Sequence, residues 1–264
     1  EKGDCSPLVT VPTKYDSLAM TNTPEEGSSF NEYSNHFAET LDDRIEVLYT
    51  GPAVVPEGIP AENVDLVKEL YGDRLGIWWN YNCNDFLRNK LCLGPMYGLD
   101  NELGEKTDYF VSNPMGWAEL NKVSEATAAD YSWNTDVYDA DASLEAAVPY
   151  VYGDGELGQA MMVFADHSTR MVGGSNSSGR ADAPETRALM DTVLKKAAAV
   201  DDLADDADVA ALRAEFDAMV EAGNYLAEHS AEVDSTNTGG THSPVANFQK
   251  LASVGEADKV ALTC

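Results

Sequence analysis

The sequence is poor in basic residues and has no long apolar run. Only 17 of its 264 residues are Lys or Arg, against 46 Asp or Glu, so the formal net charge is −29. A surface this acidic repels phosphate backbones, so we expect no nucleic-acid partner. No apolar run reaches the roughly 18 residues of a membrane-spanning helix, so we also predict no membrane span.

Metal-binding patterns are missing as well. The chain has four cysteines, Cys5, Cys83, Cys92 and Cys264, without the CxxC spacing of a structural zinc site, and their disulfide status stays open. The four histidines are scattered, with no HExxH motif. We therefore predict no metal site.

The first residues, Glu1 to Cys5, contain neither the basic nor the apolar region of a signal peptide, and the sequence starts without Met. We therefore expect a fragment or a processed chain. The strong acidity fits a protein that works outside the cell.

Short apolar segments alternate with helical periodicity through the first half of the sequence. This alternation predicts βα units and a parallel sheet. The expected strands are 8–11, 45–49, 75–79 and 109–111, and the expected helices between and after them are 30–41, 60–71 and 116–129.

Each expected strand is followed by polar or aromatic groups that can bind a ligand. The carboxyl ends of parallel strands meet at one edge, as in a (β/α)8 barrel. Four units make only half a barrel, and open sheet edges are avoided in proteins. We therefore expect the N-terminal half of a barrel to be missing; a complete four-stranded open sheet is the alternative.

The stretch 76–86 is the most informative part of the sequence. It passes from the apolar run that contains Trp78 and Trp79 into a polar cluster with Asn80, Asn84 and Asp85. An aromatic wall beside amide and carboxylate groups suits a sugar, whose ring has an apolar face and directional hydroxyls. The alternative is that both tryptophans are core and the amides form a turn.

The second half is rich in Ala, Asp and Glu and has helical periodicity. Ser143 is the expected N-cap of a helix that reaches Tyr152, and Pro184 is expected at the first position of another. Further helices are expected at 158–167, at 208–229 and from Pro244. We predict a half-barrel domain over 1–152 and an antiparallel helical bundle over 153–264.

Several segments together resemble family 84 of the glycoside hydrolases, the β-N-acetylglucosaminidases that include O-GlcNAcase and bacterial enzymes often labelled hyaluronidases. In the expected barrel they are VPTKY (11–15), YTG (49–51), WWNYNCND (78–85), LGP (93–95), SNPM (112–115) and ADYSWN (129–134). HSTR (167–170) and GRADAPE (179–185) resemble the helical domain of bacterial members.

The resemblance implies a glycosidase that removes terminal β-linked N-acetylglucosamine (GlcNAc) with retention, through substrate-assisted catalysis, from glycans or glycoproteins. It implies no metal and no organic cofactor, and a secreted or cell-surface bacterial setting. Carried over to this sequence, it assigns Asp85 and Asn113 to the distal hydroxyls and Asn80 to the acetamide region. Trp78 and Tyr15 would wall the acetamide pocket, and Thr50 would line it.

One departure from the family is decisive. The adjacent Asp pair that catalyses the reaction in this family precedes the VPTKY segment, and here only Asp4 lies in that region. The pairs Asp42–Asp43 and Asp201–Asp202 lack the strand context, so we expect this chain alone to be inactive. Two other hypotheses are a non-catalytic carbohydrate-binding protein and a helical module for attachment or oligomerisation.

Overall fold

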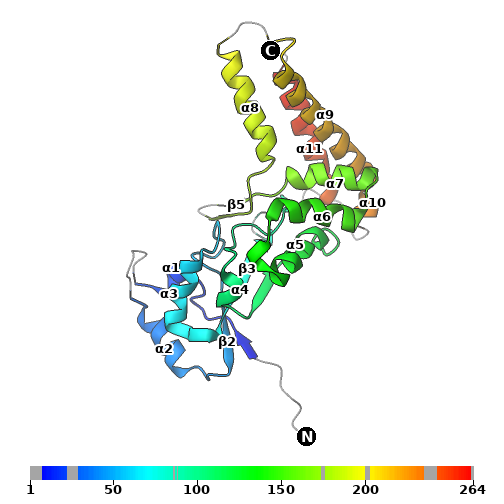
Figure 1. The fold of residues 1–264 in the computed structure, drawn as a ribbon. Coiled ribbons are helices and arrows are strands. Elements are labelled where there is room, and N and C mark those ends of the chain that lie inside the picture. Colours follow the sequence, from blue (N-terminus) through cyan, green and yellow to red (C-terminus); the bar gives the residue numbers. More distant parts are fainter. Residues whose placement is uncertain are drawn as a thin grey trace.

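The computed structural model describes residues 8–22, 29–85, 87, 89–173, 176–199, 203–234 and 243–262. The N-terminal half of the chain contains a sheet with helices around it, and the C-terminal half is a group of helices that extends away from that sheet (Figure 1). Cys5, Cys264 and the pair Asp201–Asp202 lie outside the described residues.

Four parallel strands form one sheet in sequence order, and helices connect them. The strands are β1 (Leu8–Thr10), β2 (Ile45–Tyr49), β3 (Leu75–Asn82) and β4 (Phe110–Asn113). The helices are α1 (Ser17–Met20), α2 (Glu32–Thr40), α3 (Ala61–Tyr71), α4 (Leu103–Lys106) and α5 (Lys122–Trp133), with 3-10 turns η1 (Gly72–Arg74) and η2 (Thr135–Val137). Sequential parallel neighbours joined by helices are the repeat of a (β/α)8 barrel, so the predicted half-barrel is confirmed.

Side-chain alternation along β3 gives the strand two different faces. Leu75, Ile77 and Trp79 are buried in one core with Val64 and Val67 of α3. Trp78 and Asn80, which alternate with these residues, therefore point to the opposite face. Trp79 is fully buried core, as the alternative reading proposed, whereas Trp78 lies on the face that carries Asn80.

Several predicted element boundaries in the half-barrel are wrong, among them the end of β4, which is Asn113, and the end of α5, which is Trp133. Two of the differences have a visible cause. β3 continues to Asn82 because Asn82 still pairs with Asn113 of β4 after a register shift. The helix expected from residue 116 begins at Lys122. The buried Asn121 side chain donates to the Met115 carbonyl at 2.7 Å and accepts from the Met115 N–H at 3.1 Å, which occupies the Met115 backbone groups.

The helical part contains α6 (Ala140–Tyr152), α7 (Glu156–Asp166), α8 (Pro184–Ala197), α9 (Ala207–Glu228), α10 (Ser230–Val233) and α11 (Pro244–Ala261). Pro184 opens α8 as predicted. Ser143 is not the N-cap of α6, because the Asp139 carboxylate accepts from the Ala142 N–H at 2.9 Å and starts the helix earlier. A hairpin of β5 (Met171–Gly173) and β6 (Asn176–Ser178) was not predicted.

A second core joins the helices to the strand-end loops. Val148 of α6, Phe164 of α7 and Phe248 of α11 pack in one apolar cluster. Leu91 and Leu93, from the loop after β3, belong to the same cluster. Apolar packing is therefore continuous across residues 152 and 153, and the division into two domains at that point stays a prediction.

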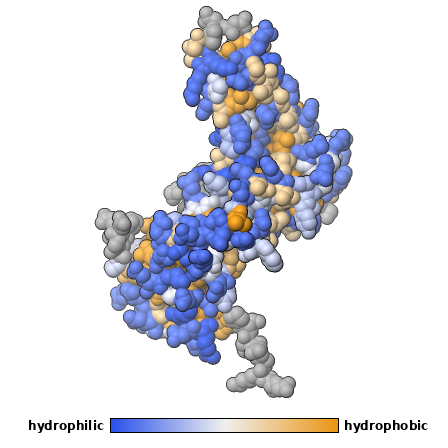
Figure 2. Space-filling view, in the orientation of Figure 1, coloured by the Kyte–Doolittle hydropathy of each residue, from blue (hydrophilic) through white to orange (hydrophobic). Residues whose placement is uncertain are grey.

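Hydrophilic residues cover most of the visible surface, with apolar patches among them (Figure 2). Trp133 and Tyr150 are among the most exposed aromatic side chains, at 90% and 86%. In the described part of the chain, no helix has both the length and the apolar character needed to cross a membrane.

Candidate functional site

The side chain of Asn80 is the centre of a hydrogen-bonded cluster at the carboxyl ends of the strands. Its Oδ1 accepts from Trp78 Nε1 and from Asn113 Nδ2, both at 2.8 Å. Its Nδ2 donates to the Val54 carbonyl at 2.7 Å. An amide with both ends engaged has one orientation, so Asn80 fixes the ends of β3 and β4 against the loop after β2.

Tyr15 and Thr50 join the loops after β1 and β2. The Tyr15 carbonyl accepts from the Thr50 N–H at 2.8 Å and from its hydroxyl at 3.3 Å. The hydroxyl also lies 2.9 Å from the Ala53 carbonyl. Thr50 is buried, so its polar atoms mainly shape the loop. The structure thus brings Trp78, Asn80 and Asn113 into direct contact, and Tyr15 and Thr50 into a second contact.

Asp85 lies in the loop beyond β3 and is exposed to solvent. Burial, followed by the nearby Asp85 charge, raises the pKa of the Cys83 thiol to about 12. Cys83 is therefore a neutral thiol at physiological pH, and it supports the loop without acting as a nucleophile. The roles assigned to Asp85 and to the other five residues stay predictions.

Two other asparagines of the stretch 76–86 hold the backbone through their side chains. Asn82 is fully buried, and its Nδ2 donates to the Cys92 carbonyl at 2.7 Å. Asn84, which the sequence placed among the sugar-facing groups, donates from Nδ2 to the Lys90 carbonyl at 2.8 Å. The residue type gives no signal that separates these amides from Asn80, because the difference depends on contacts with residues further along the chain.

Oriented amides beside a solvent-accessible carboxylate can bind and orient hydroxyl groups. Cleavage of a glycosidic bond requires more, namely carboxyl groups placed to protonate the leaving oxygen and to assist attack at C1. Asp42 and Asp43 cannot supply them here, because they precede β2 and therefore lie at the opposite edge of the sheet. Asp42 instead forms an ion pair with Arg44, which holds the pKa of that carboxyl well below its usual range.

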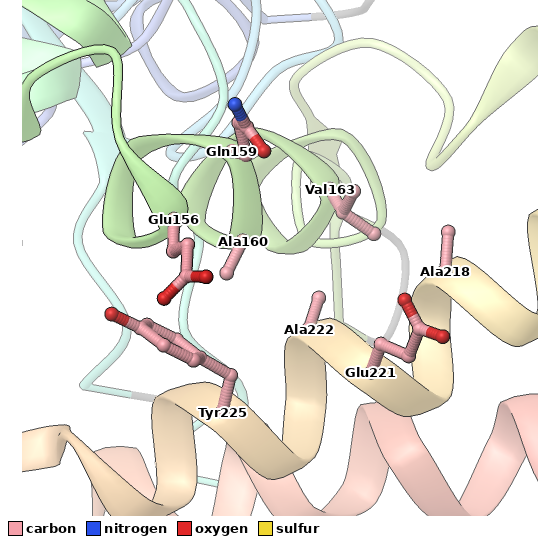
Figure 3. Close-up of a pocket in the computed structure, with 8 residues that line it drawn as sticks. All are labelled: Glu156, Gln159, Ala160, Val163, Ala218, Glu221, Ala222 and Tyr225. Atoms are coloured by element: carbon pink, nitrogen blue, oxygen red, sulfur yellow. The ribbon is translucent and has the colours of Figure 1, made fainter.

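A separate groove of about 430 Å³ lies between α7 and α9 (Figure 3). Glu156 faces Tyr225 across it, and burial, followed by the Glu156 charge, raises the pKa of the Tyr225 hydroxyl. The groove is lined by helical residues alone and shares none of them with the Asn80 cluster.

Comparison with known proteins identifies the family. The family model described as beta-N-acetylglucosaminidase matches residues 1–166 of the chain. The chain belongs to the beta-N-acetylglucosaminidase family. The Asn80 cluster and Asp85 all lie inside the matched region.

The chain is much shorter than the relatives and the solved structures that it matches. Protein O-GlcNAcase of Rattus norvegicus and that of Mus musculus are each 35% identical to it over 103 residues, which is 39% of the chain and 11% of either protein. The solved structure of CpGH84B is 32% identical, with a TM-score of 0.80 over 98% of the chain and 43% of that protein. The O-GlcNAc hydrolase of Thermobaculum terrenum, at 22% identity and a TM-score of 0.69, shares the fold over 97% of the chain and 49% of its own length.

Proposed function

We propose that this chain is the sugar-holding half of a β-N-acetylglucosaminidase that removes terminal β-linked GlcNAc with retention. The observation that carries the proposal is the Asn80 cluster, in which Trp78 and Asn113 both donate to the Asn80 side chain. These side chains are pre-oriented by hydrogen bonds of 2.8 Å at the end of a parallel sheet where ligands bind in barrel folds. Membership of the β-N-acetylglucosaminidase family supports the reaction class.

Each group then has a defined part in binding. Asp85 accepts hydrogen bonds from the distal hydroxyls of GlcNAc, and Asn113 holds the same hydroxyls. Asn80 lies near the acetamide, with Trp78 and Tyr15 as apolar walls. A charged acceptor in contact with a hydroxyl contributes roughly 1.5–3 kcal/mol, so Asp85 should dominate the affinity.

Catalysis in this proposal is substrate-assisted. The acetamide oxygen of the substrate attacks C1 and forms an oxazoline while one carboxylate polarises the acetamide. A second carboxylate protonates the leaving oxygen and then takes a proton from the water that opens the oxazoline. This route is an exception to the scheme with a carboxylate nucleophile.

Both carboxylates are proposed to lie in a barrel segment that precedes the residues of this chain. Two observations support that placement. Leu8 and Val9 of the edge strand β1 are 63% and 52% exposed, as expected for a strand that lacks its neighbour. The chain also spans only 43% of CpGH84B. We further propose a secreted or cell-surface bacterial enzyme that is hyaluronidase-like in its substrate, and its acidity supports an extracellular setting.

Asp85→Ala tests the proposal in the full-length protein, including whatever its gene encodes around these residues. We expect kcat/KM on a chromogenic β-GlcNAc substrate to fall roughly 10- to 100-fold, as the loss of a charged hydrogen bond predicts. Asp154→Ala, at an exposed position between α6 and α7, is the matched control and should leave kcat/KM unchanged. Absence of turnover in the wild type, or turnover indifferent to Asp85→Ala, contradicts the proposal. GlcNAc binding by calorimetry without turnover would instead favour a carbohydrate-binding protein.

A further inference from the structure

The backbone near Asp85 is held by a short local ring of hydrogen bonds. The Asn84 side chain donates to the Lys90 carbonyl at 2.8 Å. The Leu87 N–H donates to the Asn84 carbonyl at 3.0 Å, and the Lys90 N–H donates to the Leu87 carbonyl at 2.8 Å. The position of Asp85 therefore depends on the position of Lys90.

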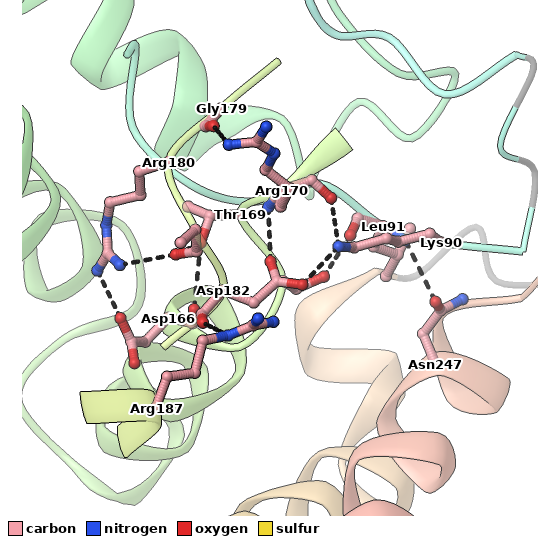
Figure 4. Close-up of polar contacts among 12 residues, drawn as sticks. Lys90, Leu91, Asp166, Thr169, Arg170, Gly179, Arg180, Asp182, Arg187 and Asn247 are labelled. Carbon is pink, nitrogen blue, oxygen red and sulfur yellow. Dashed lines mark hydrogen bonds and ion pairs between the residues drawn. The ribbon is translucent and has the colours of Figure 1, made fainter. Parts of the chain in front are cut away.

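Lys90 is in turn bound to the segment between α7 and α8 (Figure 4). Its Nζ contacts Asp182 Oδ2 at 2.8 Å and also donates to the Arg170 carbonyl. The other oxygen of the Asp182 carboxylate accepts from the Arg170 N–H at 2.6 Å. Asp182 thus uses both carboxylate oxygens, one on the strand-end loop and one on the backbone that leads from the helical part.

The segment itself is firmly held. The Tyr81 hydroxyl at the end of β3 donates to the Thr169 carbonyl at 2.9 Å. The Leu93 N–H donates to the Ser168 carbonyl at 2.8 Å, and the Leu91 N–H donates to the α11 residue Asn247 at 3.2 Å. These contacts hold the backbone next to Arg170 and next to Lys90, the two places that the Lys90–Asp182 pair connects.

Resting on the proposed function, we propose that Asp182 and Lys90 are positioning residues that hold Asp85 in register with the GlcNAc hydroxyls. Neither residue needs to touch the sugar. Both side chains are partly buried, 26% exposed for Lys90 and 21% for Asp182, so water screens the pair less than it screens an exposed pair. The helical part of the molecule therefore contributes to sugar affinity through one ion pair.

Lys90→Met in the full-length protein tests this inference through two independent measurements. Hydrogen exchange should become faster in peptides that cover residues 84–90 and remain unchanged in the core of α9. KM for a chromogenic β-GlcNAc substrate should rise roughly tenfold with little change in kcat, because a misplaced binding group weakens substrate binding more than it slows the chemical step. Lys90→Arg keeps the charge and should restore most of the affinity.

Lys196→Met is the matched control. Lys196 pairs with Asp206 at 2.8 Å within the helical part and is 38% exposed, but its ion pairs do not involve the strand-end loop. It should change neither the loop exchange nor KM.

The outcomes separate the inference from the function on which it rests. Unchanged exchange in residues 84–90 of Lys90→Met would overturn the inference. Faster exchange with unchanged KM would also overturn it, while a response to Asp85→Ala in the same assay would leave the proposed function standing. If Asp85→Ala has no effect either, the proposed function fails and the positioning role fails with it.

Discussion

His167, which caps the carboxyl end of α7, lies in surroundings that favour its neutral form. Burial is the largest influence and lowers its pKa; Arg187 acts in the same direction, against the carboxylates of Asp166, Asp182 and Glu215. The pKa of this histidine is lower in the folded state than in the unfolded state, where it is about 6.5. Its contribution to stability is therefore fully present at pH values above about 6.5. That contribution is lost as the pH falls below this value toward the lower folded pKa.

We therefore expect the wild type to lose more unfolding free energy than His167→Gln between about pH 8 and about pH 5.5. Urea unfolding at both pH values measures the difference, and carboxylate contributions common to both proteins cancel. His36→Gln, at an exposed position on α2, should behave like the wild type. Equal losses in the wild type and in His167→Gln would refute the effect of burial on His167.

At the scale of single residues, the sequence could identify chemistry but not partners. The sequence indicates Trp78, Asn80 and Asn113 through residue type, their place at strand ends and the family resemblance, and the structure joins them directly. Asn84 was selected on the same grounds, yet it binds the backbone of Lys90. The role of Asp182 has no sequence signal, because its contact with Lys90 spans 92 positions and leaves no periodic pattern.

The long helices α9 and α11 pack at very close range through glycine. A Cβ added at Gly223 would lie 2.6 Å from the Ala252 nitrogen and 2.6 Å from the Phe248 oxygen, both backbone atoms of α11. Backbone cannot move aside as a flexible side chain does, so the helices would have to separate.

Gly223→Ala should therefore destabilise the protein by up to about 2 kcal/mol. Overpacking costs roughly 1–3 kcal/mol, and the gain in helix propensity offsets about 1 kcal/mol of that cost. The urea midpoint measures this effect. Gly116→Ala is the control, since a Cβ there meets no atom within 4 Å, and it should stay within about 0.5 kcal/mol. A variant Gly223→Ala more stable than the wild type would show that propensity prevails.

At the scale of elements, the presence of most helices and strands could be predicted from the sequence, but some of their boundaries could not. The spacing of apolar residues found β2, α3 and α9 to within a residue of their observed ends. α5 starts late because the Asn121 amide occupies the Met115 backbone, and α6 starts early because Asp139 caps it. Both shifts come from individual polar contacts that periodicity does not register.

For the whole molecule, the half-barrel followed from simple repetition of strand and helix. The contact between the two halves of the chain did not follow, because it depends on the loop 83–94 and on a core that includes Leu91 and Leu93. A loop has no period, so its packing partners cannot be inferred from spacing. The coupling proposed for Lys90 and Asp182 lies in this region.

The charge of the whole molecule leads to a prediction about salt. A formal charge of −29 makes the folded state repel itself, and salt screens this repulsion over a Debye length of about 10 Å at 0.1 M. Salt also weakens surface ion pairs such as Arg44–Asp42, but exposed pairs contribute little to stability. The net repulsion should therefore prevail.

We expect the melting temperature at neutral pH to rise by a few degrees between about 20 mM and about 500 mM NaCl. Calorimetry measures the shift. The same titration near pH 4.5 is an internal control, because protonation of carboxylates reduces the net charge and should reduce the salt effect with it. A melting temperature that falls with added salt at neutral pH would mean that ion pairs such as Lys106–Asp65 outweigh the repulsion among the excess carboxylates.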